Sequence, residues 1–556
     1  MKPRRSKILD FFHHSFTSRN HDHPSNNCIL MKTTLRHPIS TSLALIKLHK
    51  SGYLLLFLAI LSSLGVFLIG LSPILHCTSS SSDREFEIGA KLVSPAQCNS
   101  TTTTTSSTST STSISNVNGV PSDEHGDEFD DFWEQPDSLG YAPCLNFSED
   151  WRRLMNKNST GSRNRFLIAV VSGGLNQQKN QIADAAVMAR VLGASLVVPV
   201  LAVDSVWGDE SEFSDIFDDR HFKNTLRDDV RVVSSLPVKY LRKRPWSPVI
   251  EAANIDEQWL RSHYMEPLRK SGVMIVRAFD SKLSKDLSPD LQKLRCKVVF
   301  KALKFRDWIE EVGDKLAKRM ASGGPYLGLH LRLEKDVWVR TGCSPGLGPR
   351  LDSQIDSERA SRVGHLKSRF NITSKHERYL AGLCPLNATH VARLLKGLGA
   401  PNNTRIYWAG GVPFGGEKAL GPLKSMFPNL YNKWDLAKEG ELDSMKKRSS
   451  VLAAIDYLVC LKSHVFMANH GGNMNRALQG HRAFLGHRKH ISPKKKQLVH
   501  LFMNATVREK EMESTIRTMH LGSMGSPVLR IMNSGRDVIA YPAPECMCSS
   551  STSPTK

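Results

Sequence analysis

Few cysteines, a shortage of acidic residues and a single long hydrophobic run set the first limits on this sequence. Ten cysteines among 556 residues are too few for a disulfide-dense scaffold, and one apolar run excludes a multi-span membrane protein. The motifs GxxxxGKS/T, HExxH and CxxC are also absent, which excludes a phosphate loop, a zinc-protease site and a dithiol redox site. With 40% hydrophobic residues the chain is neither wholly disordered nor collagen-like, and its length predicts more than one domain.

The shortage of acidic residues leaves a net charge of +22, from 75 Lys and Arg against 53 Asp and Glu. A chain this basic is a candidate nucleic-acid binder, but the distribution of the charge argues against that function. Residues 1–50 carry nine Lys or Arg and two Asp, and residues 51–75 carry no charge. This apolar run is long enough to cross a bilayer, and the positive-inside rule keeps the basic tail cytosolic. We therefore expect a single-pass type II membrane protein without a nucleic-acid partner.

A low-complexity stem follows the predicted anchor. Fifteen of the seventeen residues 99–115 are Ser or Thr, and such a composition buries too little apolar area to fold. A short tail, one anchor and a Ser/Thr-rich stem before a large folded region is the layout of Golgi membrane transferases, so we expect the folded region in the Golgi lumen. The predicted segments are a tail (1–50), an anchor (51–75), the stem (76–130), two folded domains (131–320 and 321–545) and a terminal tail (546–556).

Glycosylation sequons and cysteines agree with a luminal location. An oxidising lumen favours disulfide pairing, and we predict a bond between Cys343 and Cys384. Cys460 lies in an apolar helical run and is expected to be a buried free thiol, while Cys546 and Cys548 are too close and isolated for a zinc site. Seven N-x-S/T sequons, all beyond the predicted anchor, are candidate N-glycosylation sites: Asn99, Asn146, Asn158, Asn371, Asn387, Asn402 and Asn504.

The folded region alternates strand and helix signals. Short apolar runs predict strands, and apolar residues at helical spacing predict helices between them. The predicted strands are 166–171, 195–200, 273–276, 326–332, 405–409 and 465–468, and the predicted helices are 180–193, 291–320, 389–398, 418–427, 451–461 and 474–480. This order predicts an α/β fold of two Rossmann-like domains that face one cleft, with the join near residue 320.

Two Gly-rich turns follow predicted strands and open predicted helices. Glycine lets the backbone approach a ligand closely, and the free N–H groups of a helix N-terminus attract an anion. In the first turn, Asn176 suits hydrogen bonds to sugar or ribose hydroxyls, and a plain strand–helix turn capped by Asn is the alternative. The turns comprise Gly173, Gly174 and Asn176, and His470, Gly471, Gly472 and Asn473.

A third candidate lies at the end of the predicted strand 326–332. Alternation along a strand places His330 and Arg332 on one face, where an Arg forks two phosphate oxygens. The alternative is that Arg332 only pairs with a nearby carboxylate, Glu334 or Asp336. No Asp-x-Asp triplet, with which many nucleotide-sugar enzymes hold a divalent cation, is present. A diphosphate would therefore rely on Arg, His and backbone N–H groups, and we expect no metal or other cofactor.

Asp456 interrupts the apolar run VLAAIDYLVCL. A carboxylate on so apolar a helix is costly unless it has a partner. Asp456 is therefore either a ligand contact or one member of a structural ion pair, and the spacing favours neither.

Five segments, spread in order over residues 140 to 545, resemble the plant O-fucosyltransferase family, which is related to GDP-fucose protein O-fucosyltransferases. They are GYAPCLNFSEDWRR, GGLNQQKNQIADAAVMARVLGASLVVPVL, LHLRLEKDVWVRTGC, IYWAGGVPFGGEKALGPLKSMFPNL and SSVLAAIDYLVCLKSHVFMANHGGNMNRALQGHRAFLGHRKHI. The resemblance implies a GT-B-like, metal-independent, inverting transferase with GDP-fucose as the donor substrate.

The resemblance also implies roles for the candidate residues. Arg332, beside His330, is expected to hold the donor pyrophosphate, and Asn176 is expected to lie near the donor sugar and the acceptor. The predicted catalytic residues are therefore Arg332 and Asn176. Asp456 is expected at the guanine or ribose end, and the turn His470–Asn473 near the phosphates. The general base is not identified, with Glu334 and Asp184 as weak candidates. A protein or cell-wall glycan is the expected acceptor, and Golgi transferase complexes are a further class of partner.

Two departures from the family pattern leave the acceptor and the donor open. His464 stands where the family typically has Asp, and the segment 336–340 is bulkier than usual. A pectin rhamnosyltransferase that uses UDP-rhamnose is one alternative, and a non-catalytic glycan-binding or scaffold protein of the Golgi is another.

Overall fold

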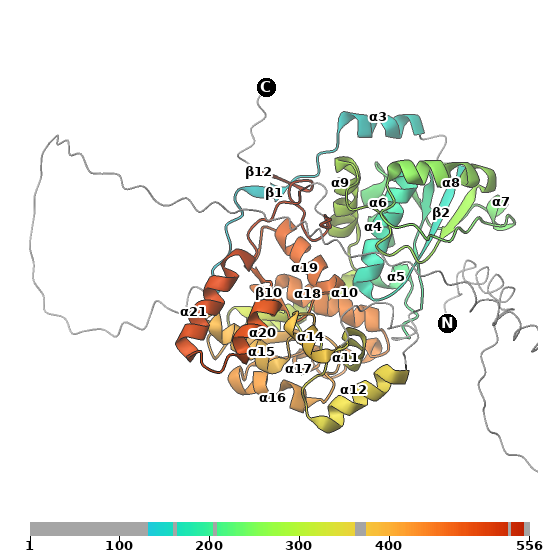
Figure 1. Ribbon diagram of the computed structural model, residues 1–556. Helices are drawn as coiled ribbons and strands as arrows, with labels where there is room; N and C mark the ends of the chain where they lie inside the picture. The colour runs from blue at the N-terminus through green and yellow to red at the C-terminus, as the bar shows by residue number, and fades with distance from the viewer. Residues whose placement is uncertain (1–131, 159–163, 204–207, 362–373, 532–534, 550–556) are drawn as a thin grey trace, which may run out of the picture. The chain divides into compact units, whose positions relative to one another are not determined.

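The computed structural model describes residues 132–158, 164–203, 208–361, 374–531 and 535–549, all within one compact unit of the chain (Figure 1). The predicted tail, anchor and stem lie outside these residues. In the part that is described, no helix combines the length and the apolar character that a bilayer crossing requires.

The first half of this unit is built on a parallel sheet around β2 (Phe166–Val171). This strand pairs with β3 (Ser195–Val197), β4 (Val200–Leu201) and β6 (Val273–Val276), and β3 pairs with β5 (Val232–Val233). The accompanying helices are α3 (Glu149–Asn158), α4 (Leu175–Val191), α5 (Phe213–Ile216), α6 (Asp219–Leu226), α7 (Val238–Leu241), α8 (Glu257–Ser271), α9 (Pro289–Lys297), the π-helix η2 (Val298–Ala302) and α10 (Asp307–Ala321).

The second half contains a five-stranded parallel sheet in the order β11-β10-β7-β8-β9. Its strands are β7 (Tyr326–His330), β8 (Arg405–Ala409), β9 (Leu430–Tyr431), β10 (Val465–Ala468) and β11 (His490–Ile491). Its helices are α11 (Lys335–Thr341), α12 (Pro349–Ser361), α14 (Lys375–Leu380), α15 (Ala388–Gly397), α16 (Glu417–Met426), α17 (Lys433–Leu436), α18 (Ser449–Lys462), α19 (Asn473–Phe484), α20 (Lys495–Met503) and α21 (Glu509–His520), with 3₁₀ turns at Asp443–Met445 and Leu521–Ser523. The predicted α/β fold with two parallel sheets is confirmed.

Alternation along β7 divides the core of the second half. Leu327 and Leu329 belong to a cluster on one face of the sheet, whereas Tyr326 belongs to a second cluster that continues into the first half. Gly328 faces α18, where an added Cβ would lie 2.9 Å from the Ser463 Oγ. One hydrophobic core therefore joins the first sheet to one face of the second.

Two predicted elements are interrupted in the structure. The predicted strand 195–200 divides into β3 and β4 around Pro199, which has no N–H to donate to the ladder. The predicted helix 291–320 divides into α9, η2 and α10. Phe305 stacks on Phe217 with ring centroids 5.5 Å apart, and Arg306 N–H donates to the carbonyl of Ile216, so a tertiary pairing draws the chain out of the helix.

Residues 546–549, the described part of the predicted terminal tail (546–556), belong to the folded unit. Strand β12 (Met547–Ser549) pairs antiparallel with β1 (Tyr141–Pro143), and the two strands lie side by side in Figure 1. Disulfides join Cys144 to Cys548 and Cys296 to Cys546. The predicted bond between Cys343 and Cys384 is present, and Cys460 is a buried free thiol as expected.

Candidate functional site

A cavity of about 620 Å³ lies at the carboxyl ends of the strands of both sheets. Its walls include the residues that follow β2, β7, β8, β9 and β10, and part of the N-terminal half of α18. Ligands of open parallel sheets bind at this end of the strands, and the volume is in the range of small-molecule sites. All predicted donor-site residues line this cavity: Gly173, Gly174, Asn176, His330, Arg332, Asp456, His470, Gly471, Gly472 and Asn473.

The first Gly-rich turn leads from β2 into α4. Gly173 has φ +83°, in the left-handed region, and an added Cβ there would lie 2.5 Å from the Gln177 Oε1. Gly174 is the N-cap residue of α4, and its N–H donates to the same Gln177 oxygen at 3.2 Å. Asn176 is therefore not the cap. Its side chain is buried, and its Oδ1 has no hydrogen-bond partner among the described residues, which leaves it available to a ligand.

Arg332 follows β7 and is held by two carboxylates. Its Nε donates to Glu334 Oε2 and its Nη2 to Asp336 Oδ2, both at 3.1 Å. Its backbone N–H donates to the Oδ1 of Asn469 at 2.7 Å. Arg332 thus forms the carboxylate pair given as the alternative and also lines the cavity, so the two interpretations do not exclude each other.

His330 lies beside Arg332 at the end of β7. Its ring is buried, and its Nδ1 has no partner among the residues that the structure describes. Burial, with the positive charge of Arg332 and the nearby His470, lowers the pKa of His330 to about 3. The imidazole is therefore neutral at physiological pH and offers a hydrogen bond without a charge.

Asp456 is one member of a buried ion pair and also lines the cavity. It accepts hydrogen bonds from Tyr407 Oη at 2.6 Å and from Lys433 Nζ at 2.9 Å. It also accepts from the N–H of Gly410 at 3.3 Å, while Glu334 accepts from the N–H of Gly411 at 2.8 Å. Two carboxylates from different elements therefore hold the Gly410–Gly411 turn after β8.

The second Gly-rich turn leads from β10 into α19. An added Cβ at Gly471 or Gly472 would meet no atom within 4 Å, so these glycines leave open space at the helix N-terminus. The Nδ1 of His470 lies 3.3 Å from the Lys495 Nζ, and burial with the charges of nearby cations lowers the pKa of His470 to about 3. A neutral imidazole and free backbone N–H groups therefore face the cavity here.

The structure adds residues that the sequence analysis did not select for the site. Lys433, Arg340, Trp408 and Trp434 also line the cavity, and Trp434 remains 43% exposed. Trp408 lies within the predicted strand 405–409, whereas Lys433, Trp434 and Arg340 lie between the predicted elements, where periodicity carries no signal. Of these last three, Arg340 alone had a local signal, because it lies one helical turn after Asp336.

A loop of the first half also contributes to the cavity wall. Asp209 accepts a hydrogen bond from the backbone N–H of Ser450 at 2.5 Å, at the start of α18. The same carboxylate lies 3.4 Å from the Ser449 Oγ. A residue of one half therefore caps the helix that carries Asp456 in the other half.

The two weak candidates for a general base occupy different environments. Asp184 does not line the cavity and is bound by Arg295 at 2.8 Å, and burial raises its pKa to about 6. Glu334 lines the cavity, but its oxygens accept from Arg332 and Gly411. Neither arrangement presents a free base to the cavity.

The two departures from the family pattern lie in different places. His464 precedes β10, at the opposite end of the strand from the cavity, where its Nδ1 accepts from the N–H of Tyr326 at 3.2 Å. In the segment 336–340, Trp338 is buried, Asp336 binds Arg332 and only Arg340 lines the cavity. Arg340 is therefore the departure with direct access to a ligand.

The sequons differ in accessibility. Asn146, Asn402 and Asn504 are exposed, whereas the half-buried Asn387 caps α15 by accepting from the N–H of His390. Asn99 and Asn371, and the side chain of Asn158, lie outside the described residues.

Over the described ranges, no group of three or more His, Cys, Asp or Glu side chains is arranged to hold a metal ion.

Comparison with known proteins gives strong sequence matches. Residues 166–485 match the model of the family described as GDP-fucose protein O-fucosyltransferase. O-fucosyltransferase 24 of Arabidopsis thaliana is 54% identical over 438 residues, covering 79% of this chain and 74% of the relative. O-fucosyltransferase 20 of the same plant is 54% identical over 419 residues, covering 75% and 73%, and O-fucosyltransferase 37 is 52% identical over 429 residues, covering 76% and 75%.

Matches to solved structures are weak. POFUT1 in complex with GDP is 14% identical, with a TM-score of 0.35 over 58% of this chain and 94% of that chain. NodZ alpha-1,6-fucosyltransferase soaked with GDP-fucose is 16% identical, with a TM-score of 0.32 over 57% and 92%.

Proposed function

This chain belongs to the GDP-fucose protein O-fucosyltransferase family and is a glycosyltransferase, and from that premise we propose that it transfers fucose from GDP-fucose to a hydroxyl group of a glycoprotein or cell-wall glycan. In the proposed reaction the acceptor oxygen attacks the fucose anomeric carbon from the opposite face, with inversion and without a metal. The bond from that carbon to the phosphate oxygen breaks, GDP leaves with the electron pair, and the proton of the acceptor hydroxyl passes to the departing phosphate or to water. The proposed setting is the Golgi lumen, behind a type II membrane anchor.

The observation that carries this proposal is the convergence of four separate segments on one cavity. The turn after β2, the end of β7, the start of α19 and Asp456 of α18 all line it. These are the positions that match the family motifs, and they lie at the carboxyl ends of parallel strands, where nucleotides bind in such folds. A surface depression without a function would not be expected to be lined by all four of these segments.

The chemistry assigned to each segment follows from its groups. Arg332 and the N–H groups at Gly471 and Gly472 are donors that stabilise negative charge as GDP departs. Neutral His330 donates or accepts a hydrogen bond beside them. Asn176 has an unpartnered amide oxygen for a sugar hydroxyl, and the buried ion pair of Asp456 with Lys433 forms another part of the cavity wall.

Nucleotide binding separates this proposal from its alternatives. The full-length chain, purified in a mild detergent, is titrated with GDP, GDP-fucose, UDP and UDP-rhamnose by calorimetry. Tight, selective binding of GDP and slow release of fucose from GDP-fucose are the expected results. Selectivity for UDP would favour a rhamnosyltransferase, and no nucleotide binding would contradict an active transferase.

Replacement of Arg332 tests the leaving-group assignment. Loss of one contact that stabilises the departing phosphate costs about 10²–10³ in rate. Arg332→Ala is therefore expected to lose nearly all fucose release from GDP-fucose while remaining folded by circular dichroism. Arg269→Ala is the matched control, since Arg269 is exposed and pairs with Glu266 away from the cavity. Near-normal turnover in Arg332→Ala would contradict the assignment.

A further inference from the structure

Arg332 alone does not supply enough positive charge at the cavity wall to neutralise an anionic diphosphate. Three Lys or Arg side chains line the cavity, namely Arg332, Arg340 and Lys433. Carboxylates line it too, among them Glu334 and Asp456. A cation of this set can neutralise a ligand only if its charge is not already compensated by an ion pair within the protein.

Two of the three cations are already neutralised. Arg332 binds both Glu334 and Asp336 at 3.1 Å, so the cluster it forms with them carries a net negative charge. Lys433 is buried and binds Asp456 at 2.9 Å. A diphosphate that met only these groups would face three carboxylates and two cations.

Arg340 is the exception. Its side chain is exposed and lines the cavity, and the described residues provide it with no ion pair and no side-chain hydrogen bond. It lies one helical turn after Asp336 on α11, hence on the same side of the helix as the carboxylate that binds Arg332. Its positive charge also acts on His470, at the entrance to α19.

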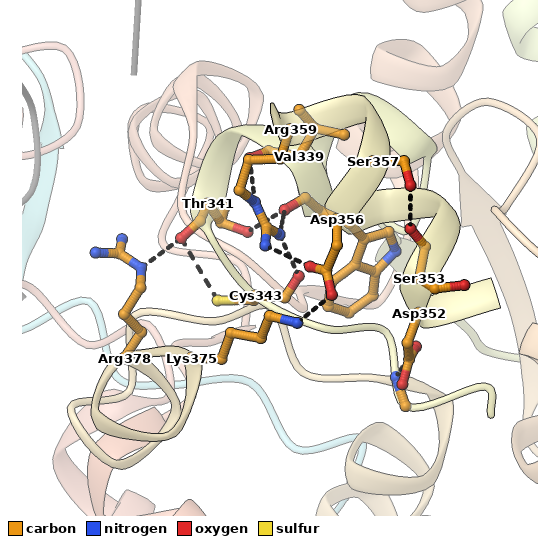
Figure 2. A network of polar contacts seen from close by, with 12 residues as sticks. Val339, Thr341, Cys343, Asp352, Ser353, Asp356, Ser357, Arg359, Lys375 and Arg378 are labelled. Carbon is orange, nitrogen blue, oxygen red and sulfur yellow. Dashed lines mark hydrogen bonds and ion pairs between the residues drawn. The ribbon is translucent and has the colours of Figure 1, made fainter. Parts of the chain in front are cut away.

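The backbone around Arg340 is fixed by a network of polar contacts (Figure 2). Arg359 of α12 donates to the carbonyls of Trp338 and Cys343 at 3.0 and 2.9 Å and to that of Val339 at 3.3 Å. Arg378 of α14 donates to the carbonyl of Thr341 at 2.6 Å. The carbonyl groups on both sides of Arg340 are thus held, while Arg340 itself lines the cavity.

The disulfide between Cys343 and Cys384 ties the end of this segment to the chain after α14. These contacts fix the backbone from which the Arg340 side chain extends, so only the side-chain rotamers of Arg340 have to be ordered when a ligand binds. Nothing in the packing of the described residues uses this guanidinium.

We infer that Arg340 is a donor-binding residue that contacts the diphosphate and supplies the positive charge that Arg332, already paired with two carboxylates, does not. Arg332 then holds its position through Glu334 and Asp336 and donates its remaining N–H groups, while Arg340 provides the uncompensated charge. The inference deepens the proposed function and rests on it for the identity of the nucleotide.

The test compares ligands with and without phosphate on the full-length chain. A charge-assisted hydrogen bond removed from a binding site costs about a 10- to 100-fold loss of affinity. Arg340→Ala is expected to weaken GDP by that factor and to leave guanosine unchanged, and Arg340→Lys to recover part of the loss. The affinity of the variant is also expected to depend less steeply on salt.

Lys335→Ala is the matched control, because Lys335 is on the same helix but pairs with Glu358 and does not line the cavity.

Inorganic pyrophosphate is the second probe, so that this inference and the proposed function fail separately. If the wild-type chain binds pyrophosphate but not GDP, and Arg340→Ala loses pyrophosphate, the nucleotide assignment is wrong and the role of Arg340 stands. If Arg340→Ala binds GDP and pyrophosphate as the wild type does, the role of Arg340 is overturned. A wild-type chain that binds neither ligand overturns both.

Discussion

At the scale of single residues, the site depends on carboxylates that act on the backbone rather than on a ligand. Gly410 has φ +149°, and an added Cβ there would lie 2.7 Å from the carbonyl oxygen of Leu331. The turn fits only without a side chain, and Asp456 and Glu334 each accept one of its N–H groups. The buried Asp456 therefore fixes the cavity wall while it neutralises Lys433.

Removal of Asp456 is predicted to destabilise the fold strongly. Asp456→Ala leaves the buried ammonium of Lys433 without a counter-charge, and breaking such a pair costs about 3–5 kcal/mol. Urea unfolding followed by circular dichroism measures this loss. The control is Asp443→Ala, which breaks an exposed pair with Lys446 and is expected to cost at most about 1 kcal/mol. Equal losses in the free energy of unfolding for the two variants would contradict the prediction that the buried pair contributes more to stability than the exposed pair.

At the scale of elements, α11 is a short helix that carries a residue of the cavity wall. Seven residues are too few for a helix to be stable by itself, so its position depends on its neighbours. Arg359, Arg378 and the disulfide of Cys343 provide those contacts. The guanidinium contacts hold carbonyl groups on both sides of Arg340, and the covalent bond holds the chain directly after α11.

Loss of this disulfide is predicted to lower both stability and donor affinity. Removing a native disulfide typically costs about 2–5 kcal/mol. Cys343→Ala, Cys384→Ala and the double variant are expected to lose similar amounts, because each breaks the same bond. Thermal unfolding and GDP titration provide the two readouts. Additive losses in the double variant, or unchanged GDP affinity in all three, would contradict this account.

At the scale of the whole folded unit, the two halves share a core and meet through α4 and α18. Lys179 of α4 is fully buried, and its ammonium lies 4.0 Å from the ring centroid of Tyr457 on α18. The hydroxyl of Tyr457 is in turn 2.8 Å from the Nδ1 of His481 on α19. Burial lowers the pKa of Lys179 to about 7 and that of His481 to about 3. A titratable amine therefore lies between the halves.

The stability of the folded unit is predicted to depend on pH through Lys179. Between the folded pKa of about 7 and the ordinary value of 10.5, the unfolded chain binds more protons than the folded chain. The contribution of this residue to stability therefore rises with pH across that window. Lys179→Met is expected to be more stable than the wild type at about pH 6, with a difference that shrinks toward about pH 10. Urea midpoints of both chains measure the gap, and a constant gap would contradict the prediction.

Much of the fold was predictable because it rests on local signals. The predicted strands 166–171, 273–276, 405–409 and 465–468 coincide with β2, β6, β8 and β10, since short apolar runs buried on both faces are characteristic of parallel sheets. The break between η2 and α10 was not predictable, because the stacking of Phe305 on Phe217 arises from residues far apart in the sequence.

By itself, the sequence determined the α/β order, the family and the donor-site residues of the two Gly-rich turns and of the end of β7, because glycine-rich turns and an Arg at the end of a strand carry their chemistry locally. Only the tertiary structure decided which charges remain available. It pairs Arg332 with Glu334 and Asp336, pairs Asp456 with Lys433, and leaves Arg340 unpaired among the described residues. The sequence offered the pairing of Arg332 with Glu334 or Asp336 as one of two interpretations, but only the fold brings Lys433 to Asp456, 23 positions away, because such a pair depends on the packing of separate elements.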